Sequence, residues 1–221
     1  MCCHCNVNCI RMNEDTANMS EKSKIGILGG TFNPIHSGHL YLAESAMEKV
    51  GLTKVLFVPS NISYMKSQAD IASVADRIAM VKLAIKNRPG FVLSKVDVER
   101  GGNSYSFKTI SDIKVQYPEA ELYFIIGADT LYSMEEWQNP DEIFAQTVIL
   151  VAYRSGEPLE HLQAKIHELE DVYHARIILV AVKKIDISSS EIRTSLKMHR
   201  PITDMVPKAV EDYMNRHMLY L

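Results

Sequence analysis

Short apolar runs alternate along this chain with segments of helical periodicity, and this alternation limits the fold more than any other feature. The runs are apolar throughout rather than at every second residue, which indicates strands that are buried on both faces of a sheet. Strands of this kind, separated by helices, are typical of a parallel sheet whose right-handed crossovers place helices on both sides. The sequence therefore predicts an α/β fold, a doubly wound parallel sheet with its ligand site at the carboxyl ends of the strands.

A single domain is predicted over residues 25–221, because no linker or internal repeat interrupts this part of the chain. The expected strands are 25–28, 55–59, 91–98, 122–127, 147–152 and 176–182. The expected helices are 38–50, 73–87, 107–116, 140–145, 158–172, 189–198 and 207–215.

Length and charge exclude several classes of protein. The chain has 221 residues, with Lys+Arg 24 against Asp+Glu 27, so it has no basic excess for binding nucleic acid. No apolar run reaches the roughly 18 residues that a membrane span needs. No apolar signal segment follows the amino terminus. We expect a cytoplasmic protein with no nucleic-acid or membrane partner; whether it forms a homo-oligomer stays open.

Cysteine occurs only near the amino terminus, so a disulfide framework through the fold is not expected. Residues 1–24 are polar and show no sustained period, and we interpret them as a disordered tail. The alternative is a zinc site, for which Cys2 and Cys5 form a C-x-x-C pair with His4 between them and Cys9 just beyond. Structural zinc sites usually join two ligand pairs from separated parts of a fold, and the tail interpretation is therefore favoured.

The densest chemical signal is the segment Gly29–His39, GGTFNPIHSGH, directly after the first predicted strand. Two glycines at a strand end allow a tight turn and let a ligand approach the backbone. Ser37 is the predicted helix N-cap. The bare amides of a helix start, with His36 and His39 three residues apart, favour a phosphate site. The alternative is a glycine turn with two histidines that only cap the helix.

A second polar segment, ISSSEIR at 187–193, follows the last predicted strand. Hydroxyl groups and free amides at a helix start bind phosphate oxygens, and Arg193 adds a charged fork. A structural interpretation is a capping box, with Ser188 at the cap and Glu191 three residues later. Both interpretations are compatible, since the cap does not use Arg193.

Together, GGTFNPIHSGH and ISSSEIR resemble the two-part signature of the nucleotidyltransferase superfamily, which has a Rossmann-like fold. Within it, the chain is similar to the bacterial nicotinate-nucleotide adenylyltransferases over about residues 25–215. The similarity includes ASVADRIAMVKLAI, VERGGNSYS and LYFIIGADTLYSMEEW. Three positions depart from the family pattern: Asn33 replaces an aspartate, Met65 replaces the histidine before Lys66, and Ser106 replaces a threonine.

The resemblance implies that the chain joins ATP and nicotinate mononucleotide into deamido-NAD, releasing pyrophosphate, in NAD biosynthesis. The attacking phosphate oxygen is already anionic near neutral pH, so catalysis needs positioning and charge stabilisation rather than a strong base. The implied catalytic residues are His36, His39, Lys66 and Arg193. Mg²⁺ would bind with ATP and keep several waters, so no protein metal cluster is predicted.

The expected ATP-binding residues lie at both motifs and at the end of the fourth predicted strand. They are Gly29, Gly30, Thr31, Phe32, His39, Gly127, Asp129, Ile187, Ser188, Ser189, Ser190 and Arg193. The expected nicotinate mononucleotide-binding residues are Ser104, Tyr105, Ser106 and Trp137.

Two of these residues carry a structural alternative. Asp129 suits a contact to ribose or to the metal–phosphate assembly, but it could instead cap the next helix. Trp137, the only tryptophan, is expected to stack on the pyridine ring, although a lone tryptophan is more often a packing residue. Asp76 and Arg77 are expected to hold the structure in place rather than touch substrate.

Three other functions agree with parts of the sequence. Pantetheine-phosphate adenylyltransferases share both motifs but would not require the segment from Asp129 to Trp137. A non-catalytic nucleotide sensor of the same fold would not need the four catalytic residues together. A metal- or redox-responsive regulator would rest on the cysteine tail alone.

Overall fold

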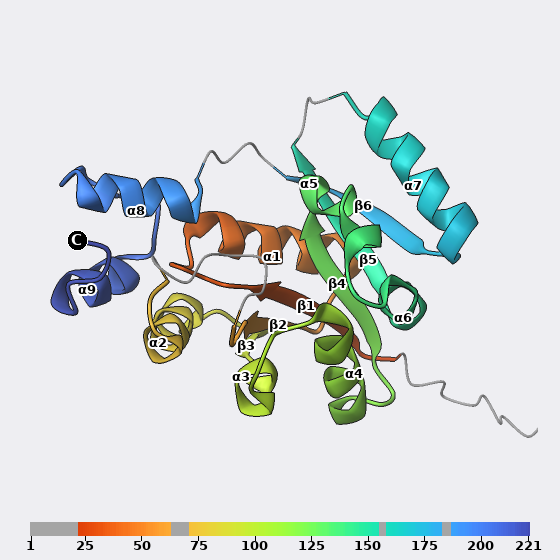
Figure 1. Ribbon diagram of the computed structural model, residues 1–221, viewed down its shortest axis with the longest axis horizontal. Helices are drawn as coiled ribbons and strands as arrows, with labels where there is room; N and C mark the ends of the chain where they lie inside the picture. Colours follow the sequence, from red (N-terminus) through yellow and green to blue (C-terminus); the bar gives the residue numbers. More distant parts are fainter. Residues whose placement is uncertain (1–21, 63–70, 155–157, 183–186) are drawn as a thin grey trace, which may run out of the picture.

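The computed structural model describes residues 22–62, 71–154, 158–182 and 187–221. In these residues a six-stranded sheet has the order β3-β2-β1-β4-β5-β6, and all of its strand pairs are parallel (Figure 1). The strands are β1 (Lys24–Gly30), β2 (Lys54–Pro59), β3 (Phe91–Leu93), β4 (Glu121–Gly127), β5 (Val148–Arg154) and β6 (Arg176–Val182). This confirms the predicted α/β fold and its doubly wound parallel sheet.

Helices cover both faces of the sheet (Figure 1). One face packs against α1 (Ser37–Val50) and α2 (Val74–Ile85), and the same apolar layer continues beyond the sheet into α8 (Ser189–Lys197) and α9 (Lys208–Arg216). The other face packs against α3 (Val96–Arg100), α4 (Ser106–Gln116), α5 (Ala128–Leu131), α6 (Pro140–Gln146) and α7 (Glu160–Tyr173). A short 3₁₀ helix, η2 (Met134–Glu136), lies between α5 and α6 in the chain.

Alternate residues of each strand serve the two apolar layers, because successive side chains of a strand point to opposite faces. In β1, Ile25 and Ile27 belong to one layer and Leu28 to the other, and all three are at most 4% exposed. The central strands are thus buried on both sides, which explains why they are apolar throughout.

The prediction of one strand over 91–98 is wrong. The strand ends at Leu93, and α3 begins at Val96. The helix is held by Asp97, whose buried carboxylate accepts hydrogen bonds from Arg100, three residues on, and from Thr109. This ion pair and the glycine that follows Arg100 favour a single helical turn over an extended chain.

The strand order reverses between β1 and β4, since one half of the sheet runs β1-β2-β3 and the other β4-β5-β6. In open α/β sheets the ligand crevice forms at such a switch point, outside the carboxyl ends of the strands. None of the described helices is both long and apolar enough to cross a membrane.

Candidate active site

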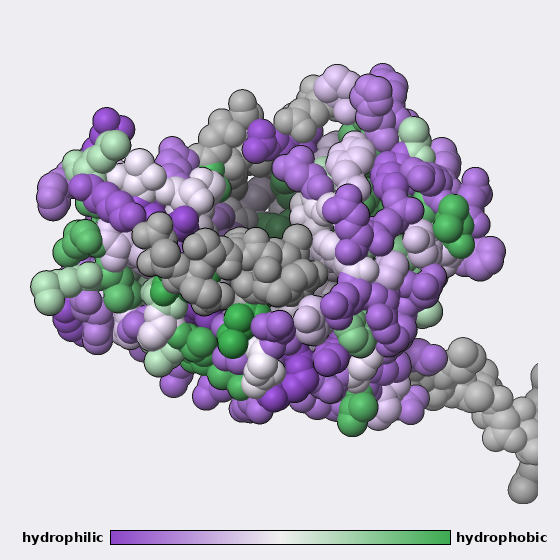
Figure 2. Space-filling view, in the orientation of Figure 1, coloured by the Kyte–Doolittle hydropathy of each residue, from purple (hydrophilic) through white to green (hydrophobic). Residues whose placement is uncertain are grey.

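Two adjoining cavities open at this switch point. The first has a volume of about 340 Å³ and is lined from α1, from the ends of β4, β5 and β6, and by Ile187. The second has a volume of about 520 Å³ and is lined from the ends of β1, β2 and β4 and from the start of α4. His39, Leu42 and Gly127 line both cavities, which are therefore two halves of one cleft. The space-filling view shows a hollow on this face, between α8 and α5 (Figure 2).

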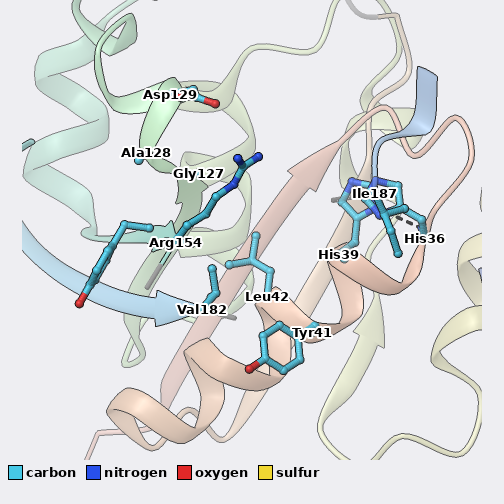
Figure 3. Close-up of a pocket in the computed structure, with 13 residues that line it drawn as sticks. His36, His39, Tyr41, Leu42, Gly127, Ala128, Asp129, Arg154, Val182 and Ile187 are labelled. Atoms are coloured by element: carbon cyan, nitrogen blue, oxygen red, sulfur yellow. Dashed lines mark hydrogen bonds between the residues drawn. The ribbon is translucent and has the colours of Figure 1, made fainter. Parts of the chain in front are cut away.

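The two histidines of the first motif lie together at the start of α1 (Figure 3). Their ring centroids are 3.7 Å apart. A Cβ atom on Gly38 would lie 3.0 Å from Nδ1 of His36, so glycine is needed for this close packing. The predicted N-cap is wrong by one residue: His36 is the N-cap, and the Ser37 hydroxyl donates instead to the carbonyl oxygen of Asp204.

The hydrogen bond between these histidines determines which nitrogen of His39 faces a ligand. The backbone N–H of His36 donates to Nδ1 of His39 over 3.2 Å. A neutral His39 therefore carries its proton on Nε2, which can donate to a phosphate oxygen. Burial lowers the pKa of His36 to about 4, so this imidazole is neutral near pH 7.

Arg77, on α2, supports the loop between β1 and α1. Arg77 is 1% exposed and donates to three backbone carbonyl oxygens: Thr31 at 2.8 Å, Asn61 at 3.1 Å and Ala72 at 3.2 Å. Asp76 accepts from Ser73 and from Tyr213. The structure thus gives Asp76 and Arg77 the supporting contacts that were expected of them.

The ISSSEIR segment packs against the same loop. Ser188 caps α8 by accepting from the backbone N–H of Glu191, as predicted. Ser189 donates to the carbonyl oxygen of Pro34 at 2.9 Å, and Arg193 donates to that of Asn33 at 3.0 Å. Ile187 lines the first cavity, whereas Arg193 lines a separate cavity of about 230 Å³ that shares no lining residue with the first. The segment therefore holds the loop as well as bordering the cleft.

The remaining residues of the first motif divide between cleft and core. Gly29, Gly30 and Thr31 line the second cavity rather than the first. Phe32 lines neither cavity: its ring is 2% exposed and meets the His39 ring edge-on, with centroids 5.1 Å apart. The Phe32 side chain therefore supports His39 from the core, and only the Phe32 backbone remains suited to the predicted contact with ATP.

Gly127 and Asp129 both border the first cavity, at the end of β4. Asp129 is the second residue of α5, whose N-cap is Gly127, so the alternative role of Asp129 as a helix cap is wrong. Sequence reasoning missed several residues of this cavity, among them Tyr153 and Arg154. The Arg154 side chain extends from β5 into the space between Asp129 and the two histidines (Figure 3).

The second cavity is bordered by Ser104, Ser106 and Trp137, as expected of an acceptor site. The Ser104 oxygen accepts from the backbone N–H of Asn61 at 2.9 Å, which leaves its own proton to donate elsewhere. The Tyr105 side chain does not line the cavity. Its ring lies beside Phe107, with centroids 6.1 Å apart, so only its backbone remains suited to the expected role.

Two buried polar atoms of the second cavity have no hydrogen-bond partner among the described residues: Ser60 Oγ and Trp137 Nε1. Buried polar atoms of this kind are usually satisfied, so a bound ligand or ordered water is expected here. Trp137 itself is half-buried and packs edge-on against Phe124. Lys66 and residues 1–21 of the tail lie outside the described residues, so their roles stay predictions. The predicted end of the tail at residue 24 is wrong by one residue, because Lys24 is the first residue of β1. In the described ranges, no group of three or more His, Cys, Asp or Glu side chains could hold a metal ion.

With this geometry in place, we compared the chain with known proteins. The family model "Cytidylyltransferase-like" matches residues 27–195. The chain is 36% identical over 198 residues to a protein of Lachnoclostridium phytofermentans named "Probable nicotinate-nucleotide adenylyltransferase", covering 90% of this chain and 99% of that protein. A protein of the same name from Dehalococcoides mccartyi is 37% identical over 201 residues, covering 89% of this chain and 97% of its own length.

The chain belongs to the nicotinate-nucleotide adenylyltransferase family. Its fold also matches solved structures of the nicotinic acid mononucleotide adenylyltransferase of Plasmodium falciparum. The form complexed with NaAD gives a TM-score of 0.75 at 18% identity, and the form complexed with APC gives 0.72 at 17%. Each comparison covers 90% of this chain and 97% of the other. At this identity, the likeness extends to the fold of the family and not to individual side chains.

Proposed function

We propose that this protein transfers the adenylyl group of ATP to nicotinate mononucleotide, giving nicotinate adenine dinucleotide and pyrophosphate. The observation that carries the proposal is the pair of cavities with a shared wall at His39 and Gly127. The volumes of both cavities fall within the range of small-molecule sites, about 300–1,000 Å³. Two substrates bound side by side would meet at this wall, where the phosphate of one can reach the other.

The first cavity is assigned to ATP. Tyr153, Arg154 and Val182, at the ends of β5 and β6, border the part that suits the adenosine, and the histidines border the part at the start of α1. His39 offers Nε2–H to the α-phosphate, and the free amides at the start of α1 favour the same anion. Arg193 supplies charge from α8 for the leaving pyrophosphate, and Lys66 is proposed to add a second cation.

The second cavity is assigned to nicotinate mononucleotide. Its lining residues in the described ranges include no Lys or Arg, so a charged side-chain clamp for the pyridine carboxylate is not offered there. The start of α4 borders it instead, and the first amides of a helix have no partner within the helix. These amides and the Ser104 and Ser106 hydroxyls donate to a carboxylate, while Trp137 stacks on the ring. The amide group of nicotinamide would present an NH₂ donor to the same donors, which disfavours it.

The chemistry follows from this placement. The phosphate monoester oxygen of nicotinate mononucleotide attacks the α-phosphorus of ATP, the bond to the β-phosphate oxygen breaks, and pyrophosphate leaves with the electron pair. The nucleophile is already anionic, so the protein contributes alignment and donors for the developing charge. Among the described residues that line the ATP cavity, Asp129 is the one carboxylate. A single carboxylate fits Mg²⁺, which is usually held mainly by substrate phosphates and water. Bound Mg²⁺ would supply charge neutralisation on the triphosphate.

The test is pyrophosphate release from the full chain with ATP and Mg²⁺, using nicotinate mononucleotide, nicotinamide mononucleotide and pantetheine phosphate in parallel. We expect the highest kcat/KM with nicotinate mononucleotide and a product with the mass of nicotinate adenine dinucleotide. Turnover with pantetheine phosphate alone, or with none of the three, would overturn the proposal.

A further inference from the structure

A buried asparagine in the β1–α1 loop is bonded to the carboxyl-terminal segment of the chain. Asn33 is 5% exposed, and its Oδ1 atom accepts two hydrogen bonds. One comes from the hydroxyl of Tyr220 at 2.6 Å and the other from the backbone N–H of Ala72 at 2.9 Å. Both donors converge on one oxygen, so they fix the orientation of the amide and, through it, the position of residue 33.

The backbone of the same residue is bonded to the second motif. The carbonyl oxygen of Asn33 accepts from Nη1 of Arg193, and Nη2 of Arg193 donates to the hydroxyl of Ser190. Residue 33 therefore joins three parts of the chain that are far apart in sequence: the β1–α1 loop, α8 and the segment after α9. His36 follows only three residues later.

The surroundings keep the Tyr220 hydroxyl protonated, so that it acts as a hydrogen-bond donor. Burial raises the pKa of Tyr220, and the positive charges of Arg193 and Arg77 lower it in part, so the phenol is protonated near pH 7. In the described ranges Arg193 donates to two neutral oxygens, the Asn33 carbonyl and the Ser190 hydroxyl, and no carboxylate pairs with it there. Among the described residues its charge is thus held beside the loop without a carboxylate partner.

We propose that Tyr220 is a positioning residue for ATP: through Asn33, to which Arg193 is also bonded, it holds the β1–α1 loop so that the two histidines face the triphosphate. The inference rests on the proposed function, because it needs ATP in the first cavity. Tyr220 does not line either half of the cleft in the described structure, so it acts through Asn33 and not by contact with substrate.

The structure offers a matched control in the same part of the chain. Tyr213, on α9, also donates its hydroxyl to a side chain on the α2 side, reaching Asp76 Oδ1 at 2.9 Å. Tyr213→Phe removes one hydrogen bond between α9 and α2, as Tyr220→Phe removes one between the carboxyl-terminal segment and the loop. Only the second change touches Asn33. A general loosening of the carboxyl-terminal segment would affect both variants, whereas a positioning role affects one.

The experiment measures the dissociation constants of a non-hydrolysable ATP analogue and of nicotinate mononucleotide for the parent, Tyr220→Phe and Tyr213→Phe. Loss of one buried hydrogen bond predicts a rise of roughly 3- to 30-fold for the ATP analogue with Tyr220→Phe. We expect less than about a twofold change for nicotinate mononucleotide, and for either ligand with Tyr213→Phe. With Tyr220→Phe the KM for ATP should rise by a similar factor, whereas the KM for nicotinate mononucleotide should stay near that of the parent. With Tyr213→Phe both KM values should stay near those of the parent.

Three results would overturn the inference: no change with folded Tyr220→Phe, an equal weakening of both ligands, or the same rise with Tyr213→Phe. Thermal unfolding of each variant shows whether it is folded. Failure of the proposed function is a different result, in which the parent itself does not form the dinucleotide or bind the ATP analogue.

Discussion

The loop at the ATP cavity and the segment around Trp137 at the acceptor cavity are held in place in different ways. Residues 31–36 of the loop are all buried, and Arg77 and Arg193 donate to its backbone carbonyl oxygens. The segment after β4 consists of a four-residue helix and a three-residue 3₁₀ helix. It is tied to α7 by the ion pair between Lys165 and Glu135, and its Tyr132 side chain is 47% exposed.

This difference predicts different consequences of mutation on the two sides. A buried carbonyl oxygen that loses a charged donor is left unsatisfied, which destabilises the folded state. Apolar stacking at a half-exposed site contributes to ligand affinity while contributing less to folding. Substitutions in the support of the loop should therefore lower stability, and those near Trp137 should lower affinity for the acceptor.

The largest expected effect is that of Arg77→Met. The change keeps the length of the side chain but leaves one buried and two partly buried carbonyl oxygens without their donor. We expect a loss of about 3–5 kcal/mol in the free energy of unfolding. The midpoint of urea denaturation measures it. The control is Arg88→Met, which breaks an exposed ion pair with Glu44 and should cost less than about 1 kcal/mol. Equal shifts in both variants would contradict the assigned support.

His39→Ala and Arg193→Ala test the loop side through activity. If both residues stabilise charge on the triphosphate, either change should lower kcat/KM by about 10²–10³. Steady-state pyrophosphate release measures it. Exposed residues provide the controls: His161→Ala on α7 and Arg200→Ala after α8 should leave kcat/KM near that of the parent. Near-normal turnover by a folded His39→Ala or Arg193→Ala protein would contradict the catalytic assignment.

Trp137→Ala tests the acceptor side. Stacking of a base on an aromatic ring contributes about 1–3 kcal/mol, so the dissociation constant for nicotinate mononucleotide should rise roughly 5- to 150-fold. The KM for ATP should change far less, because Trp137 lines only the second cavity. Tyr132→Ala, in the same segment but outside the cavity lining, is the control. If both substrates weaken equally, or neither does, Trp137 is a packing residue.

Most of the fold can be predicted from the sequence, because a strand that is buried on both faces is apolar at nearly every residue. The strands at 25–28, 55–59, 122–127, 147–152 and 176–182 are found because they are apolar on both faces. Residues 91–98 mislead because Ser94 and Lys95 stand between two apolar stretches. A strand that continues and a strand that turns into a helix there have similar patterns. The decisive contact, from Asp97 to Thr109, joins residues 12 apart and is made only once α4 is in place.

The site is predictable only where a motif carries it. The glycine–histidine segment and ISSSEIR are recognisable in the chain, and the structure brings them together by the bonds of Ser189 and Arg193. By contrast, the cavity residues Tyr41, Leu42, Tyr153, Arg154 and Val182 come from a helix flank and two strand ends. No local pattern marks them. The bond between Tyr220 and Asn33 spans 187 residues and depends on the whole fold.

The smallest expected effect is a pH dependence of the free energy of unfolding, caused by His36 in the β1–α1 loop. Burial lowers the pKa of His36 from 6.5 to about 4 in the folded protein. Between these values the unfolded chain binds a proton that the folded protein does not, so stability falls as the pH drops from about 6.5 towards 4. From pH 7 to pH 6 the contribution of this residue is less than about 1 kcal/mol.

His36→Asn replaces the imidazole by a polar group that does not titrate. The free energy of unfolding should decrease less between pH 7 and pH 6 in this variant than in the parent. The difference should equal the contribution of His36, which is less than about 1 kcal/mol. Denaturation curves at the two pH values measure the difference. His167→Gln, at an exposed position on α7, should keep the parental slope. If His36→Asn keeps it as well, the imidazole titrates normally in the folded protein, and the loop is more open to water than its burial indicates.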